Sequence, residues 1–520
     1  MKKEIIYNEE ATELIKNTVI KLCDLVGLTL GPKGTNAIID TDYSEPFITN
    51  DGVTIAKNIE FDLKEEVVAK IIKEASIKTC NKVGDGTTTS LVLLKSIYLE
   101  SLKCIKEGLS PFIIKDLLEK KTDLICKEVL SKSKKSKYSD LEHIAAISSG
   151  NKDIGKIIRK AFESVGIYGK VIVEESNNEN TFLDVINGMY LDSGVVSSFM
   201  INNRFKEEII ENAYILITDY KINSIEEIKN ILYELKEKNL LIVADSFDEE
   251  VIVYLSSLKF NNEVNVVCID SPNYSENKTD ILEDICAFTK SNFISKKFSK
   301  NLEDINISDL GIAKKIKITR KNTIIYNETS EAVNNRIKYI NKLFKAEDSE
   351  FEKEILESRL ASLSKGIAVI YAGAKTNSEM ILNKMRIEDA ISASKMALKY
   401  GHSLGGGLTF YRISENLQMD SIENKILKKS LKAPIERILI NSKINPNEVF
   451  KELNNKKDNV GFDASTGKYL DMEVLGIIDP TMVLIEALKN ALSIASVLLT
   501  TSLIIVTNSK KELKNITEVL

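Results

Sequence analysis

Gly84–Thr89, the stretch GDGTTT, indicates more about the fold and site of this 520-residue chain than any other. Glycines let the backbone approach an anion closely, and threonines at a helix start accompany free N–H groups that point outward. A second segment, Leu28–Gly34 (LTLGPKG), precedes it, and Asn50–Thr54 (NDGVT) lies between them. Aspartates suit a phosphate pocket only when a divalent cation separates carboxylate from phosphate. Together the three segments predict a site for a nucleotide with Mg²⁺.

Taken one at a time, these motifs are weak. The pair Gly31-Pro32 is ordinary turn chemistry, the spacing is not that of a P-loop, and Gly84–Gly86 could be a helix-capping turn. Further along, Asp389 could simply favour a helix dipole, and Gly405–Gly407 could be a helix cap and bend. Only their joint occurrence decides between these interpretations.

Composition excludes some classes of function. Lys and Arg number 71 against 76 Asp and Glu, a net charge of −5, so we expect no nucleic-acid partner. Six scattered cysteines and two histidines argue against a zinc site. The N-terminus has neither an apolar signal core nor an Arg/Ser-rich presequence, so we expect a cytoplasmic protein. The uncharged segment 490–509 is long enough to cross a bilayer, but its serines and threonines favour a buried core helix, and we expect no membrane association.

The pattern of apolar residues divides the chain into three parts. Helical spacing marks the first 130 residues, including a helix from Thr87 that is apolar nearly all round. In the middle, short β-branched runs such as 214–217, 240–243 and 264–267 alternate with amphipathic helices. Helix returns from about Asp389 to the end. An α/β module is therefore predicted within a helical one, with two to four domains in all.

The order of the motifs LTLGPKG, DGV, GDGTTT, EDA (388–390), GGG (405–407) and DPT (479–481) resembles that of the chaperonins. The chain is most similar to the bacterial-type (group I) chaperonins, the GroEL family, nearly end to end, as a divergent member. The resemblance implies a multidomain fold, α and α/β. Both chain ends (1–131 and 400–520) would form a helical equatorial ATPase domain, 132–187 and 367–399 a small intermediate hinge domain, and 188–366 an inserted α/β apical domain.

The resemblance also implies an ATP site with Mg²⁺, and K⁺ as a further candidate cation. Asp389 would activate the attacking water after a hinge motion, Asp51 would assist from the opposite side, and Asp85 would bind Mg²⁺. Gly406 and Asp479 would hold the ribose. The residues expected to contact ATP are Thr29, Leu30, Gly31, Pro32, Asn50, Asp85, Gly86, Thr87, Thr88, Thr89, Gly406, Asp463, Ala464, Ser465 and Asp479.

In the apical domain the resemblance implies a groove for non-native client proteins and a GroES-like co-chaperonin lid. The groove candidates are Val195, Phe199, Met200, Leu232 and Ile252, with Gly188 and Gly366 as hinges. The implied assembly is a homo-heptameric ring, normally two stacked as a 14-mer. The implied function is an ATP-hydrolysing chaperone that captures non-native proteins and promotes their folding in a closed chamber.

Two departures from the family pattern stand out. Asn50 replaces a lysine that is common near the phosphates, and the groove positions Lys229, Ser256 and Ser257 are polar where apolar residues are usual. These departures indicate altered client preference or co-chaperonin affinity rather than a lost ATPase. Two rivals stay open: a paralogue that serves as a scaffold or adhesin without ATP turnover, and a metabolic phosphotransferase. Mg²⁺-dependent ATPase activity separates the first from a chaperonin, and particle size separates the second.

Overall fold

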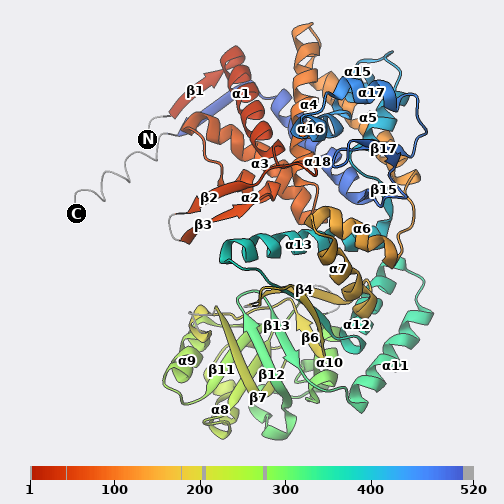
Figure 1. The fold of residues 1–520 in the computed structure, drawn as a ribbon. Helices are drawn as coiled ribbons and strands as arrows, with labels where there is room; N and C mark the ends of the chain where they lie inside the picture. Colours follow the sequence, from red (N-terminus) through yellow and green to blue (C-terminus); the bar gives the residue numbers. More distant parts are fainter. Residues whose placement is uncertain (1–2, 42–43, 177, 202–205, 273–277, 508–520) are drawn as a thin grey trace. The chain divides into compact units, whose positions relative to one another are not determined.

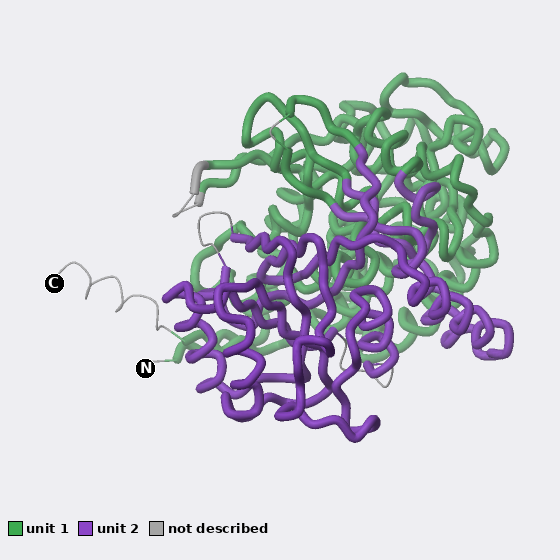
Figure 2. Tube along the Cα trace, turned by 90° about the horizontal axis from the view of Figure 1, so that it is seen from below, with its two compact units in different colours: residues 1–160, 173–182, 370–520 green, residues 161–172, 183–369 purple. Residues whose placement is uncertain are grey.

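The computed structural model describes residues 3–41, 44–176, 178–201, 206–272 and 278–507. The chain forms two compact units (Figure 2). Unit 1 contains Met1–Lys160, Val173–Phe182 and Ile370–Leu520, and unit 2 contains Ala161–Ile172 and Leu183–Val369. Unit 2 is thus inserted in the sequence of unit 1. This arrangement confirms the predicted fold class, an α/β module within a helical module formed by both chain ends.

The two units do not coincide with the three predicted domains. Residues expected in an intermediate domain are shared between the units: 132–160, 173–182 and 370–399 belong to unit 1, and 161–172, 183–187 and 367–369 belong to unit 2. Contacts within the chain therefore group the helix around Asp389 with the equatorial segments. The division into three domains stays a prediction.

Unit 1 is built on helices from both chain ends. Thr87 begins a helix of 20 residues, α4, whose Leu91, Leu93 and Leu94 are fully buried, as its apolar sequence predicted. It packs against the C-terminal helix α18, and α3 and α5 pack against α18 as well (Figure 1). The helices are α1 (Asn8–Gly27), α2 (Gly52–Asn58), α3 (Leu63–Val83), α4 (Thr87–Lys106), α5 (Pro111–Ser131), α6 (Tyr138–Ser149), α7 (Lys152–Val165, which runs into unit 2), α13 (Asn377–Tyr400), α14 (Leu408–Asn416), α15 (Ile422–Ser430), α16 (Ala433–Asn441), α17 (Pro446–Leu453) and α18 (Thr481–Leu499).

Helix α18 is long and apolar enough to cross a membrane, and 72% of its most hydrophobic window is buried inside the protein. Its side chains Ala487, Leu488 and Ala491 belong to the same apolar core as those of α4. Burial of this kind is what a central helix of a large core requires. The predicted core helix 490–509 is therefore helical only as far as Leu499, because Leu503–Thr507 form a strand instead.

Among the described residues, unit 1 contains four two-stranded antiparallel sheets. The first pairs the two chain ends, with Ile5 opposite Ile505. A second forms a hairpin directly before Asn50, and the other two include Asp479 and Asp463. These pairs are β1 (Lys3–Tyr7) with β19 (Leu503–Thr507), β2 (Ala37–Thr41) with β3 (Ser44–Thr49), β15 (His402–Leu404) with β18 (Ile478–Pro480), and β16 (Val460–Asp463) with β17 (Lys468–Asp471).

Unit 2 is built around a six-stranded mixed sheet of order β11-β9-β7-β12-β13-β6. Strands β7, β9 and β11 are parallel, and β12, β13 and β6 continue the sheet antiparallel. The three predicted β-branched runs lie in β7, β9 and β11. The elements are β6 (Gly188–Leu191), β7 (Glu207–Ile217), β8 (Lys221–Ile222), α8 (Lys229–Glu234), β9 (Asn239–Ala244), β10 (Ser246–Phe247), α9 (Glu249–Phe260), β11 (Asn265–Asp270), α10 (Lys278–Thr289), β12 (Gly311–Thr319), β13 (Thr323–Tyr326), α11 (Glu331–Ala346) and α12 (Glu350–Ser364).

Three further strands carry the chain from one unit to the other: β4 (Lys170–Glu175), β5 (Phe182–Ile186) and β14 (Ile367–Ala372), in the order β4-β14-β5. The predicted hinge glycines flank these strands. Gly366 directly precedes β14 with φ +67°, and a Cβ there would lie 2.4 Å from the carbonyl oxygen of Ile186. Gly188 begins β6. Glycine is required at 366 by both conformation and space.

Candidate nucleotide-binding site

The stretch GDGTTT forms the turn between α3 and α4. Gly84 ends α3 with φ +71°, and Gly86 begins α4 with φ +77°. Both lie in the left-handed region that glycine adopts most readily. Thr87 and Thr88 are buried in the first turn of α4, whose leading N–H groups have no partner within the helix. This turn is therefore suited to an anion, as the sequence predicted.

The segment Leu28–Gly34 lies beside this turn. The hydroxyls of Thr29 and Thr88 are 3.2 Å apart and within hydrogen-bond distance, although 59 residues separate them. The segment is a compact loop, since the Thr35 N–H donates to the carbonyl of Leu28 at 2.9 Å and Gly31 has φ +89°. Two of the predicted segments are thus brought together.

Side chains of helix α16 donate hydrogen bonds to backbone carbonyls of the loop and of the residue before it, a contact that was not predicted from the sequence. Asn441 Nδ2 donates to the carbonyls of Gly27 and Leu30, each at 2.9 Å. Arg437 Nε donates to the carbonyl of Gly27 at 3.0 Å. These side chains lie more than 400 residues from the loop in sequence, and no local pattern reveals such a partner.

The third segment, around Asp51, also lies against the first turn of α4. Asp51 caps α2, and its carboxylate accepts from the N–H groups of Val53 at 3.1 Å and Thr54 at 2.9 Å. A Cβ at Gly52 would lie 2.3 Å from the Thr88 hydroxyl, so only glycine lets α2 begin this close to α4. All three predicted segments therefore converge on the first turn of α4.

Asp85 lies in the turn itself and is held by two donors. Its own neighbour Gly86 donates an N–H at 2.5 Å, and Ser148 of α6 donates its hydroxyl at 3.1 Å. Burial raises the pKa of Asp85, the two donors lower it, and the charge of Asp51 raises it further. Ser148 was not among the predicted site residues.

Asp389 reaches this cluster from α13. Burial, followed by the charges of Asp51, Asp85 and Glu388, raises the pKa of Asp389 well above its usual range. A Cβ at Gly84 would lie 2.2 Å from the Cβ of Ser392, so α13 packs directly on the turn. The structure thus brings together the three carboxylates Asp51, Asp85 and Asp389.

The donor set fits a hard divalent cation. Carboxylate and hydroxyl oxygens are the ligands that Mg²⁺ prefers, and it usually keeps water and phosphate oxygens as further ligands. Within the described residues, no group of three His, Cys, Asp or Glu is arranged to hold a metal by itself. A cation here would therefore share its coordination with a bound phosphate, with Asp85 as the residue best placed to hold it.

The residues expected to hold the ribose lie on a neighbouring pair of strands. Asp479 of β18 pairs with Ser403 of β15. Burial, with the charge of Asp85, raises the pKa of Asp479 to about 7, against the lowering effect of the Gly406 N–H. Gly406, with φ +63°, is followed by Gly407, which begins α14. A Cβ at Gly86 would lie 2.6 Å from Val483, three residues after the end of β18, so this pair of strands adjoins the phosphate turn.

Asp463 ends β16 and makes its hydrogen bonds within its own turn. Its carboxylate accepts from the Ser465 N–H at 2.9 Å, the Ser465 hydroxyl at 2.6 Å and the Thr466 hydroxyl at 2.6 Å. Despite some burial, these bonds lower the pKa of Asp463. Met472 approaches both Gly461 of β16 and Gly406, so the adenine candidates Asp463, Ala464 and Ser465 adjoin the ribose candidates.

Asn50, which stands where the family pattern has lysine, contacts α13. Its Oδ1 accepts from Arg386 Nε at 3.1 Å. The preceding residue, Thr49, places its hydroxyl 3.7 Å from the sulfur of Met385. The loop before Asp51 is therefore in direct contact with the helix that carries Asp389.

The predicted groove residues of unit 2 differ in exposure. Phe199 is 81% exposed and Val195 and Ile252 are partly buried, whereas Met200 and Leu232 are buried in the core of unit 2. The structure thus contradicts a groove face that includes Met200 and Leu232, because their side chains fill the apolar interior. Large exposed apolar side chains directly follow two of the candidates in sequence, at Tyr233 and Val253, and Phe260 at the end of α9 is exposed as well.

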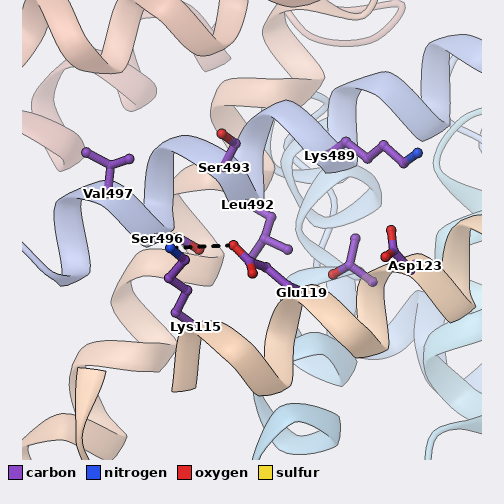
Figure 3. A pocket seen from close by; sticks show the side chains of 9 residues that line it. Lys115, Glu119, Asp123, Lys489, Leu492, Ser493, Ser496 and Val497 are labelled. Carbon is purple, nitrogen blue, oxygen red and sulfur yellow. Dashed lines mark ion pairs between the residues drawn. The ribbon is translucent and has the colours of Figure 1, made fainter. Parts of the chain in front are cut away.

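Two hollows lie away from the phosphate turn. One, of ≈ 480 Å³, is on α9 and includes Val253 and Tyr254. The other, of ≈ 350 Å³, lies between α5 and α18, where Lys115 and Glu119 form an ion pair at 3.9 Å (Figure 3). Neither hollow includes a predicted ATP-site residue. The nucleotide site is defined by its loops and carboxylates.

Comparison with known proteins identifies the family of the chain. The model of the TCP-1/cpn60 chaperonin family matches residues 22–509. The chain is also similar to the chaperonin gp146 from the bacteriophage EL 2 (Pseudomonas aeruginosa), whose crystal structures were obtained in the presence of ATP-BeFx. Two crystal forms give TM-scores of 0.75 and 0.68 at 20% and 19% identity, each covering 97% of this chain and 99% of that chain. The chain belongs to the TCP-1/cpn60 chaperonin family.

Proposed function

We propose that this protein is an ATP-hydrolysing chaperonin that captures non-native proteins and promotes their folding. The observation that carries the proposal is the convergence of Asp51, Asp85 and Asp389 on the first turn of α4, in a chain of the chaperonin family. The related phage chaperonin was crystallised in the presence of ATP-BeFx, which supports a nucleotide at the corresponding site.

Each part of the site has a role in this reaction. The N–H groups of Thr87, Thr88 and Thr89 bind phosphate oxygens, and the loop 29–32 closes over the nucleotide from the side that α16 supports. Asp85 would hold Mg²⁺, whose positive charge would let phosphate oxygens and carboxylates share one pocket. Phosphoryl transfer needs mainly positioning and charge neutralisation, and these residues provide the positioning.

Asp389 is the residue best suited to accept a proton from the attacking water. Burial and the neighbouring carboxylates raise its pKa well above the usual range. A carboxylate with a raised pKa is a stronger proton acceptor, once ionised, than an ordinary one. Asp51, held by the N–H groups of α2, assists from the loop before α2, and Gly406 and Asp479 bind the ribose.

Assembly and partners follow from the same proposal. We expect a bacterial-type ring of seven subunits, stacked as a 14-mer in the cytoplasm, with a GroES-like lid and K⁺ as a further cation. The sheets β1-β19 and β2-β3 support subunit contact, because each has open edges and exposed apolar side chains, among them Ile5, Ile38 and Ile505. Exposed Phe199, Tyr233 and Phe260 support capture of apolar client surface by unit 2.

The test is ATP hydrolysis by the purified protein with and without Mg²⁺, compared with Asp389→Ala. We expect Mg²⁺-dependent turnover and a loss of about a hundredfold or more in the variant, the range for a general base. Nucleotide binding, measured by calorimetry, should persist. An Asp389→Ala variant that hydrolyses as fast as wild type would contradict the assignment. Refolding of an aggregation-prone denatured protein, with ATP and a co-chaperonin, then tests the chaperone function.

A further inference from the structure

Arg386 lies three residues before Asp389 in α13, so both side chains belong to the same face of the helix. Its Nε donates to Asn50 Oδ1 at 3.1 Å, and its Nη2 lies 3.5 Å from Asn36 Oδ1. Asn50 directly precedes Asp51, and Asn36 follows the loop Leu28–Gly34. One side chain of α13 therefore bridges two of the loops that form the nucleotide site.

The surroundings of Arg386 are unusual for a half-buried arginine. No ion pair found among the described residues includes it, and both of its partners are neutral amides. Burial lowers the pKa of its guanidinium, since no acid opposes the cost of removing this cation from water. The guanidinium is a fixed fork of donors that suits two acceptors at once. Its position is thus explained by the two amide oxygens rather than by charge pairing.

Asn50 is essential to this contact. A lysine at position 50, as in the family pattern, would offer no acceptor and would place a second cation against Arg386. Asparagine supplies the carbonyl oxygen that the guanidinium uses. The residue that replaces the family's lysine therefore forms a connection between the loop and α13.

We propose that Arg386 is a positioning residue that holds the Asp389-bearing turn of α13 against the two phosphate-site loops through Asn50 and Asn36. This inference rests on the proposed function and assigns a further residue to the same site. Arg386 acts through α13, and Asp389 is the group that would meet the water. Because both partners are neutral amides, the connection is weaker than an ion pair would be.

The first test is steady-state ATP hydrolysis by Arg386→Gln, Arg386→Lys and Asn50→Lys. We expect kcat to fall about tenfold or more in all three, because a small misplacement of a reacting group has effects of this size. The affinity of Arg386→Gln for nucleotide should change by less than about threefold. Lys384→Gln is the matched control, since Lys384 is a cation of the same helix that pairs with Glu175 at 2.9 Å; it should turn over as wild type does.

The second test needs no nucleotide. Hydrogen exchange of the peptide 377–400 should be faster in Arg386→Gln than in wild type and Lys384→Gln, because the contact is present in the ligand-free chain. If wild type does not hydrolyse ATP, the proposed function fails while the exchange experiment still tests Arg386. Unchanged exchange in the variant overturns the positioning role, whatever happens to kcat. Arg386→Lys provides the same comparison if Arg386→Gln does not fold.

Discussion

Gly84 offers the most direct test of how α13 is seated on the nucleotide site. We predict that Gly84→Ala destabilises the protein for two separable reasons. A non-glycine residue at φ +71° costs about 1–2 kcal/mol. The added Cβ would also lie 2.2 Å from Ser392 Cβ, and overpacking of this kind costs about 1–3 kcal/mol. The expected loss is therefore about 2–5 kcal/mol in the free energy of unfolding.

The two contributions can be separated by changing Ser392. Ser392→Gly removes the Cβ that is in the way, at a cost of about 1 kcal/mol for glycine within a helix. Ser392→Ala is the matched control, because it removes the hydroxyl but keeps the Cβ. We expect Gly84→Ala to be about 1–3 kcal/mol less harmful in the Ser392→Gly background than in the Ser392→Ala background, a coupling that a double-mutant cycle measures.

The assay is urea unfolding followed by far-UV circular dichroism, at one protein concentration so that assembly contributes equally. ATP turnover of each variant is measured alongside. A Gly84→Ala protein within about 0.5 kcal/mol of wild type, the range of ordinary surface substitutions, would refute the close approach of α13 to the turn. Equal losses in the glycine and alanine backgrounds would show that conformation alone explains the effect.

Three further predictions concern separate parts of the molecule. The pKa of Asp479 is about 7 in the folded protein against an ordinary 3.8, so the native state keeps a proton that the unfolded chain loses. The stability that this proton contributes falls as the pH rises from about 4 to about 7, by at most about 4 kcal/mol and less where water reaches the carboxyl. Asp479→Asn should flatten this pH dependence, which unfolding at several pH values will measure. Asn441→Ala removes three hydrogen bonds to the backbone carbonyls before Pro32, and should raise KM for ATP about tenfold with kcat little changed, which initial rates will measure. Phe199→Ser should reduce binding of a denatured client while the free energy of unfolding stays within about 0.5 kcal/mol of wild type, because Phe199 is exposed. Met200→Ala should cost about 2–5 kcal/mol of stability, because Met200 is buried. Calorimetry measures the stability and client co-sedimentation the binding, and the reverse pattern would contradict the exposed position of Phe199 and the buried position of Met200.

The fold class and the phosphate-binding turn could be predicted from sequence because their signals are local. The helix from Thr87 is apolar on nearly every face, which identifies a central helix before any partner is known. The β-branched runs of the middle third likewise appear as strands β7, β9 and β11 of one sheet. In each case the signal is the spacing of apolar residues or a backbone position that needs glycine, and it lies within about twenty residues of sequence.

The remaining features depend on contacts between distant residues. Asn441 and Arg437 support a loop more than 400 residues away, and nothing around them in sequence indicates it. The family pattern offered Phe199 and Met200 as neighbours in one groove, but consecutive residues of a short turn point to different sides, and Met200 is buried. The three-domain division also depends on long-range packing, and it stays a prediction beside the two units that the contacts define.

The pKa values of the carboxyl groups at the site depend on neighbouring carboxylates, so these residues act as a group. Asp51 alone is an ordinary helix cap, yet its charge raises the pKa of both Asp85 and Asp389, and Asp85 in turn raises that of Asp479. In the unfolded chain these four residues are far apart and do not repel one another. Folding therefore brings these carboxylates together, and their repulsion is relieved either by proton binding or by a bound cation. A cation relieves it while leaving the base, Asp389, ionised. A site built in this way gains most from a ligand that brings its own metal, which is the property expected of a nucleotide-driven chaperonin.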